Sequence, residues 1–365
     1  MTNLIAIIRK NYKAIWVTII IIGILYLAGY VFYLFYNQRR YDTITTNQKI
    51  IELFENATPM VTTEITTTSQ TTEETKYIEK LTTPIPILVL ASTDNQDYID
   101  FINHYWIPLL TWLDSHRGPE LNVYIYLIFG AGNSFDAVNI PEALKQYFLI
   151  FEDIPESYTP GILQKTVRGF EEMGVKHPDY TLLYRTNIST FLLLDRIVAR
   201  MNKVIDENGH GKQNTVCTEL VTQCNATGVS GIYWGCQLNS PPEYNKHKLD
   251  TNIRYVSGTD IMLSHDVVQF IIDNKGKLNY DIVDDLEIGH FLHDNKNIIG
   301  TNPVEHILWK CKPEDIHMNN YLAEVLNDIQ TNNNFMIVRL RCPDSSNTRK
   351  PDTDVMKFLL SNYYS

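Results

Sequence analysis

The chain has 365 residues, with 31 Lys and Arg against 42 Asp and Glu, which gives a formal net charge of −11. Hydrophobic residues make up 44% and charged residues 20%. These values are near the globular average and exclude a wholly disordered chain. A nucleic-acid-binding surface needs a basic patch, so the acidic balance predicts no nucleic-acid partner.

The N-terminal region predicts a membrane anchor. Residues 14–35, AIWVTIIIIGILYLAGYVFYLF, are 22 residues without a charge, and a helix of this length spans about 33 Å, enough for a bilayer core. The alternative, a cleaved signal peptide, would be shorter and would end in small residues instead of aromatic ones. Three basic residues precede the span and two follow it. This weak asymmetry predicts that residues 1–13 are a cytoplasmic tail and that the chain is a single-pass type II membrane protein.

Residues 36–83 predict a stem. Of the 26 residues in 58–83, 11 are Thr and few are large and apolar. Such a segment cannot bury enough surface to offset the entropy lost on ordering, so we expect it to be disordered. The composition is typical of an O-glycosylated stalk, and a plain flexible linker is the alternative. Either would hold the remaining domain, 84–365, away from the membrane.

All five cysteines and the sequon at Asn225 follow the predicted span. If this part of the chain is lumenal, the cysteines allow up to two disulfides, and Asn225 is expected to carry an N-glycan. If it is cytosolic, the cysteines would stay reduced.

The C-terminal domain alternates apolar runs of strand length with segments of helical spacing. The predicted strands are 86–92, 121–129, 147–151, 180–184 and 335–340. The predicted helices are 98–113, 160–173, 190–201, 265–274, 284–293 and 354–364. This order predicts an α/β fold with a mostly parallel sheet flanked by helices. Ligands of such sheets bind beyond the carboxyl ends of the strands, which places 92–95, 130–134 and 185–189 near one site.

Three separated segments resemble the β1,3-galactosyltransferase and fringe type of glycosyltransferase. Residues 153–166 read DIPESYTPGILQKT and are similar to the block D-x-x-(D/E)-S-Y-x-x-L-x-x-K-T of that family. Residues 180–191, YTLLYRTNISTF, stand in the place of Y-x-x-K-x-D-D-D-x-F. Residues 255–264, YVSGTDIMLS, followed by DDLEIG at 284–289, are similar to Y-x-S-G-x-x-Y-x-(L/M)-S followed by D-D-(V/T)-x-x-G.

The resemblance implies a GT-A fold, a lumenal domain in the Golgi or an equivalent compartment, and inverting sugar transfer. The donor would be a nucleotide sugar, with UDP-sugars first, and the acceptor a glycan or glycoprotein. An inverting enzyme needs a carboxylate that takes a proton from the acceptor hydroxyl. By resemblance this base is Asp285, with Asp284 and Glu287 as further acids on the acceptor side. Adjacent carboxylates raise each other's pKa, which suits a base.

The aspartate triplet of the family is replaced here by Asn187-Ile188-Ser189. In the family that triplet holds Mn²⁺ against the donor diphosphate, and a serine hydroxyl is a poor substitute for a carboxylate ligand. An Asp352-Thr353-Asp354 sequence exists, but we expect it in a polar loop. The same replacement, with the tail R-K-x-D-x-D, also resembles proteins encoded by large DNA viruses.

The cofactor is therefore an open question, with three explanations. Mn²⁺ binds through other ligands, or the enzyme works without metal, or the domain has lost transfer activity and binds glycans only. In the metal-free case Arg and Lys side chains would hold the diphosphate. The candidate donor-binding residues are Arg185, Asn187, Ser189, Arg339 and Arg341.

Overall fold

The computed structural model describes residues 83–118, 121–208, 231–239, 253–296, 306–310, 317–340 and 349–364. The predicted tail and anchor, nearly all of the predicted stem, Asn225 and Arg341 lie outside these ranges. Within them, no helix is both long and apolar enough to cross a membrane. The chain divides into two compact units, and the larger holds residues 65–318 and 325–365. Of the smaller unit, the described residues are Asn319–Glu324, which are helical.

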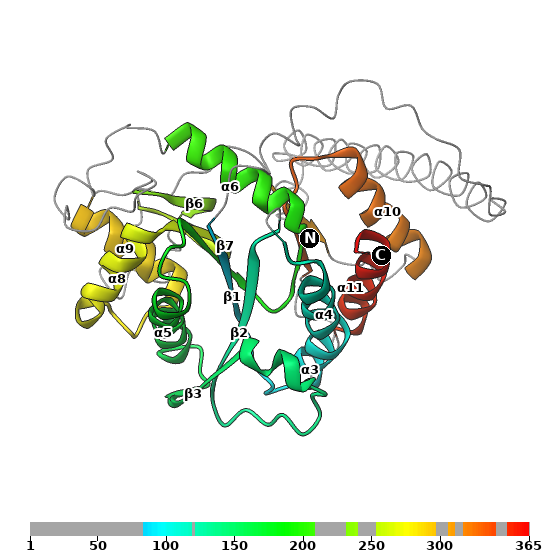
Figure 1. The fold of residues 1–365 in the computed structure, drawn as a ribbon, viewed down its shortest axis with the longest axis horizontal. Coiled ribbons are helices and arrows are strands. Elements are labelled where there is room, and N and C mark those ends of the chain that lie inside the picture. The colour runs from blue at the N-terminus through cyan, green and yellow to red at the C-terminus, as the bar shows by residue number, and fades with distance from the viewer. Residues whose placement is uncertain are drawn as a thin grey trace, which may run out of the picture. The chain divides into compact units, whose positions relative to one another are not determined.

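A six-stranded mixed sheet forms the centre of the larger unit (Figure 1). Its strands are β1 (Ile85–Leu90), β2 (Val123–Ala131), β3 (Phe148–Pro155), β4 (Leu182–Asn187), β6 (Tyr233–Asn239) and β7 (Arg254–Ser264). Their order is β3-β2-β1-β4-β7-β6. The first four are mutually parallel, whereas β7 is antiparallel to β4 and β6 is antiparallel to β7. The prediction of an α/β fold with a mostly parallel sheet is confirmed.

The register of the sheet brings the carboxyl ends of β1 and β4 together. Leu90, the last residue of β1, pairs with Asn187, the last residue of β4. Because β7 runs the opposite way, its first half lies at this same edge, and Arg185 pairs with Ile261. Segment 257–259 of β7 therefore meets the residues that follow β4.

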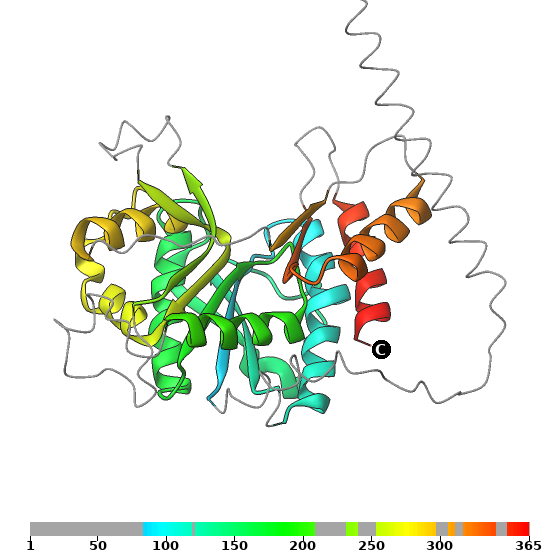
Figure 2. The same cartoon turned by 90° about the horizontal axis from the view of Figure 1, so that it is seen from above.

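Helices cover both faces of the sheet (Figures 1 and 2). On one side lie α5 (Gly161–Lys176), α8 (His265–Asp273) and α9 (Asp284–Lys296). On the other lie α3 (Gln96–Phe101), α4 (Ile107–His116) and α11 (Lys350–Tyr363). A π-helical stretch, η1 (Ile102–Trp106), joins α3 to α4. The remaining helical elements are η2 (Glu142–Tyr147), α6 (Leu194–Asn208), η4 (Lys275–Lys277) and α10 (Met318–Thr331).

A glycine permits the close packing of α9 on β7. A Cβ atom at Gly289 would lie 2.3 Å from Tyr255 Cβ and 2.9 Å from Tyr255 Cα. Any larger residue would push the helix away from the strand. The first turn of α9 carries Asp284 and Asp285, so this contact sets the position of both carboxylates.

A second, three-stranded sheet has the order β5-β9-β8. Its strands are β5 (Thr190–Leu192), β8 (Ile307–Lys310) and β9 (Ile337–Leu340). β5 pairs antiparallel with β9, and Thr190 lies opposite Arg339. This pairing brings the C-terminal part of the chain next to the loop that follows β4.

Two sequence predictions about elements are wrong. The helix expected at 190–201 begins only at Leu194, because the buried residues 190–192 form β5. The acidic pair Asp352 and Asp354 lies in the first turns of α11, not in a polar loop.

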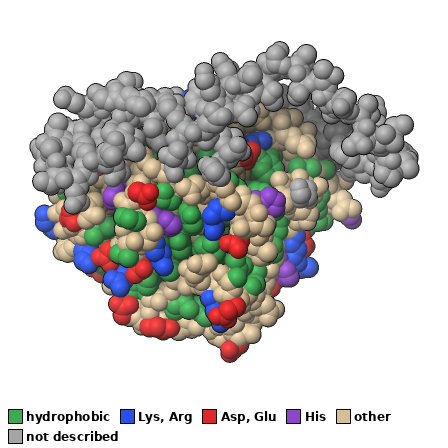
Figure 3. Space-filling view, in the orientation of Figure 1, with side chains coloured by type: hydrophobic (Ala, Val, Ile, Leu, Met, Phe, Trp, Pro, Cys, Tyr) green, Lys and Arg blue, Asp and Glu red, His purple; other side chains and the backbone are tan. Residues whose placement is uncertain are grey.

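On the face in Figure 3, Asp and Glu of the described residues are interspersed with Lys and Arg.

Candidate active site

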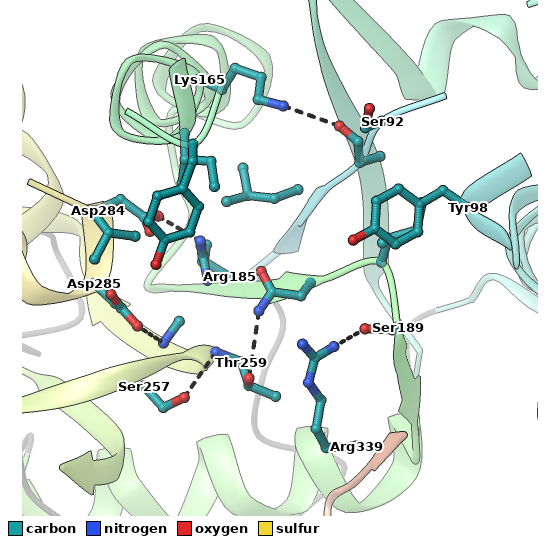
Figure 4. Close-up of a pocket in the computed structure, with 18 of the residues that line it drawn as sticks. Ser92, Tyr98, Lys165, Arg185, Ser189, Ser257, Thr259, Asp284, Asp285 and Arg339 are labelled. Carbon is teal, nitrogen blue, oxygen red and sulfur yellow. Dashed lines mark hydrogen bonds and ion pairs between the residues drawn. The ribbon is translucent and has the colours of Figure 1, made fainter. Parts of the chain in front are cut away.

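A cavity of about 820 Å³ opens at the carboxyl ends of β1 and β4 (Figure 4). Its walls come from these strand ends, from residues 257–259 of β7, from the first turn of α9 and from β8 and β9. Most of the residues predicted to form the site line it, namely Arg185, Asn187, Ser189, Asp284, Asp285 and Arg339. Segments distant in sequence thus converge where the strand pattern predicted a site.

Glu287 does not line this cavity, although the sequence suggested it for the acceptor side. Its side chain is buried, and its Oε1 accepts a hydrogen bond of 2.8 Å from the backbone N–H of Asn279. Burial raises the pKa of Glu287 to about 7. The geometry therefore connects Glu287 to the turn that precedes α9.

A buried ion pair joins β4 to α9. Arg185 Nη2 donates to Asp284 Oδ2 at 2.6 Å, and both side chains are 2% exposed or less. Thr166 Oγ1 donates to the same oxygen at 2.7 Å. The segments 153–166 and 284–289, singled out separately in the sequence, therefore meet at one carboxylate. Removing one partner of such a pair leaves a buried charge uncompensated.

Asp285 is the partly exposed carboxylate of the cavity. Its Oδ2 accepts from Gly258 N and its Oδ1 from Leu286 N, both at 2.8 Å. Burial, followed by the negative charge of Asp284, raises the pKa of Asp285 to about 6, while Arg185 and the two backbone N–H groups oppose the rise. The carboxylate is therefore largely ionised at neutral pH and a stronger base than an ordinary aspartate, as a general base requires.

Gly258 leaves room for this charged cluster. A Cβ atom there would lie 2.3 Å from Arg185 Nη1 and 3.1 Å from Asp285 Oδ2. The Arg185 Nη1 and Nε atoms are buried and make no hydrogen bond. The guanidinium thus fills the space that a side chain at Gly258 would take.

The opposite side of the cavity carries Arg339 and Ser189 (Figure 4). Arg339 Nη1 donates to Ser189 Oγ, and Leu340 N donates to Ser189 O at 3.3 Å. Asn187 Nδ2 is 3.5 Å from Thr259 Oγ1. Arginine thus stands beside the residues that replace the acidic triplet.

A polar network closes the cavity near the end of β1. Lys165 Nζ is buried and donates to Ala91 O at 3.1 Å and to Glu156. Glu156 Oε2 also accepts from Gly130 N at 2.9 Å and from Asn133 Nδ2 at 2.8 Å. Burial lowers the pKa of Lys165, and Glu156 acts against that change. The network ties the segment 153–166 to the loops after β1 and β2.

Three further residues of the cavity had no role predicted from the sequence. Tyr98, Tyr158 and Trp309 line the cavity, and Tyr158 and Trp309 are 63% and 50% exposed. Tyr158 and Lys165 belong to the block at 153–166, so the sequence did contain a signal for them. Nothing in the sequence pattern connects Trp309 or Tyr98 to the site, because they reach it through tertiary packing alone.

The residues after β4 do not fit a divalent metal ion. Divalent metal ions favour charged carboxylate oxygens, but the side chains of this segment offer only the neutral amide oxygen of Asn187 and the hydroxyl of Ser189. Over the described ranges, no three or more His, Cys, Asp or Glu side chains are grouped so that they could hold a metal ion. The alternative Asp352 is buried and accepts from Arg349 Nε at 2.9 Å.

Cys236 is the one cysteine among the residues that the structure describes. Cys236 on β6 is a free thiol, and burial raises its pKa. The other four cysteines lie outside the described residues, so the predicted disulfides stay a prediction.

Comparison with known proteins adds no family to this picture. No protein-family model matches the sequence, and no curated protein matches it either.

Proposed function

We propose that this chain is an inverting glycosyltransferase of the GT-A type, which moves a sugar from a nucleotide sugar to a glycan or glycoprotein. One observation carries the proposal. A single cavity holds a carboxylate with a raised pKa, Asp285, and on its opposite side arginine side chains suited to phosphate. The cavity lies beyond the carboxyl ends of parallel strands, where open α/β sheets bind nucleotides.

In the proposed reaction Asp285 removes the proton from an acceptor hydroxyl. The acceptor oxygen forms a bond to the anomeric carbon as the bond from that carbon to the phosphate oxygen breaks. The electron pair leaves with the nucleoside diphosphate, whose added negative charge must be stabilised. Attack from the face opposite the leaving group inverts the configuration.

The sequence resemblance supports this assignment through residues that meet in space. Thr166 from the first block bonds Asp284 of the last, and Gly258 from the Y-x-S-G block bonds Asp285. UDP-sugars are the donors that the resemblance implies. The membrane anchor and a Golgi-type lumen belong to the same proposal.

A second function is favoured by a different observation. The acidic triplet is absent, and two exposed aromatic side chains, Tyr158 and Trp309, line the cavity. Aromatic faces suit stacking against sugar rings, so the alternative is an inactive transferase fold that binds glycans on a membrane-tethered stalk.

Ligand stabilisation separates the two functions. A transferase binds the nucleotide, so UDP and its sugar conjugates should raise the melting temperature of the full chain in detergent. At 100 times its dissociation constant, a ligand stabilises by about 2.7 kcal/mol. If only oligosaccharides raise the melting temperature, the glycan-binding module replaces the transferase.

A further inference from the structure

The position of Arg339 helps to decide whether a divalent metal ion can bind at Ser189. The resemblance places a metal-binding carboxylate after β4, and in this chain Ser189 stands there, bonded by the Arg339 guanidinium. Arg339 is 8% exposed and faces the cavity. Its backbone is fixed by the pairing of β5 with β9, in which Thr190 lies opposite Arg339. The strand pairing of the second sheet therefore fixes the backbone that carries Arg339. Its contact with Ser189 does not depend on a flexible surface side chain.

A metal ion and this guanidinium cannot share Ser189. An ion coordinated by Ser189 Oγ would lie about 2–3 Å from an oxygen that already accepts a hydrogen bond from a cation. Two positive groups bound to the same oxygen atom repel strongly in a partly buried site. Ser189 therefore accepts a hydrogen bond from Arg339 at the position where the resemblance places a carboxylate that binds a metal ion.

A second guanidinium lines the same cavity. Arg349, at the start of α11, donates from Nε to Asp352 Oδ2 at 2.9 Å and from Nη2 to Leu340 O. Its guanidinium carbon lies 5.0 Å from the centre of the Phe101 ring. Leu340 follows Arg339 directly on β9, so the two arginines are tied to one backbone segment. Asp94 lines this cavity too, but it is exposed, so solvent screens its charge.

We propose that Arg339, with Arg349 beside it, binds the diphosphate of the nucleotide sugar in place of a divalent metal ion. The inference rests on the proposed function, which it deepens. Guanidinium groups donate paired hydrogen bonds to phosphate oxygens and keep their charge at every physiological pH. Arg339 would then stabilise the negative charge that develops on the departing nucleoside diphosphate, as the metal does in the family.

The test is the affinity of the full chain in detergent for UDP, measured by calorimetry in Mn²⁺ and in EDTA. We expect the wild-type affinity to agree within about twofold between the two conditions. Arg339→Gln should weaken UDP binding about 10- to 100-fold, as the loss of a charge-assisted hydrogen bond does. Uridine, which lacks the phosphates, should bind both proteins equally.

Two further variants keep this test decisive. Arg349→Gln changes a half-buried residue at the start of α11 and should weaken UDP binding in the same direction even if Arg339→Gln folds poorly. Arg168→Gln, on an exposed position of α5 outside the cavity, is the matched control and should bind UDP normally.

The results that would overturn the arginine site differ from the result that would overturn the proposed function. UDP binding that requires Mn²⁺, or that is unchanged in both cavity variants, overturns the arginine site and leaves the transferase standing. Absence of UDP binding to the wild-type chain under both conditions overturns the proposed function itself.

Discussion

At the scale of single residues, the chemistry proposed for the cavity depends on how three charged groups share a small volume. Arg185 neutralises Asp284, and Asp284 in turn acts on Asp285. Asp284, whose Oδ2 accepts from both Arg185 and Thr166, is buried, whereas Asp285 is partly exposed in the cavity. We therefore expect a structural role for Asp284 and a chemical one for Asp285.

Replacing Asp285 by Asn should reduce turnover about 10²- to 10⁴-fold, the usual contribution of a general base. A base acts in its ionised form, and the pKa of Asp285 is about 6. The wild-type kcat/KM should therefore be level above pH 6 and fall about tenfold per pH unit below it. Kinetics over pH 4.5–8.5 would measure both effects.

Stability provides the control for that variant. A carboxyl group whose pKa is raised on folding stabilises the protein fully only at pH values below its unfolded pKa, and that contribution is lost as the pH rises through the folded pKa. Asp285→Asn has no ionisable group here, so its melting temperature should fall less between pH 5 and pH 7.5 than that of the wild type. A folded variant with normal turnover would refute the role of Asp285.

The Arg185–Asp284 pair leads to a separate expectation. Arg185→Gln leaves Asp284 buried without its cation, and such changes destabilise a fold by about 3–5 kcal/mol. Arg185 also lowers the pKa of Asp285, so the acid limb of the pH profile should move to higher pH. Arg168→Gln, which breaks exposed pairs with Glu171 and Glu172, should cost about 0.5 kcal/mol or less. An unmoved acid limb would show that Asp285 is not the titrating group.

At the scale of elements, the contact between α9 and β7 fixes the site. Gly289→Ala would force a Cβ atom to within 2.9 Å of the Tyr255 backbone, so the helix must shift. We expect a loss of about 1–3 kcal/mol in stability and a drop in turnover, since Asp285 moves with the helix. Thermal unfolding together with steady-state kinetics would measure it.

Gly174 in α5 offers the matched substitution. A Cβ atom there meets nothing within 4 Å. Gly174→Ala should therefore stabilise the protein by about 0.5–1 kcal/mol through helix propensity and leave turnover unchanged. Equal effects of the two substitutions would mean that the close contact at Gly289 does not matter.

At the scale of the whole molecule, the sequence predicted the parallel half of the fold best. The continuous apolar run at 86–92 became the fully buried β1, at Ile85–Leu90, because both faces of a central parallel strand are covered. The strand-end argument also placed Asn187 and Ser189 correctly at the cavity. By contrast, β6 and β7 interrupt their apolar residues with Gly235, Ser257 and Gly258, so they lack a clear strand period.

The remaining parts of the site could not be found by pattern. Arg339 and Ser189 are 150 positions apart, and their contact exists only because the three-residue β5 pairs with β9. A strand that short has no periodicity to detect. The apolar residues of 190–201 fit a helix as well as a short strand. The sequence therefore predicted one helix over this segment, and β5 was missed.

We propose that this chain transfers sugar from a nucleotide donor. The most direct measurement is nucleoside-diphosphate release by the full chain in detergent, from a panel of UDP- and GDP-sugars, with a glycan acceptor mixture and in EDTA. We expect release that depends on the acceptor, that continues in EDTA, and that is lost in Asp285→Asn but kept in Asp281→Asn, an exposed neighbour. No release from any donor, with or without Mn²⁺, would overturn the proposed transferase activity.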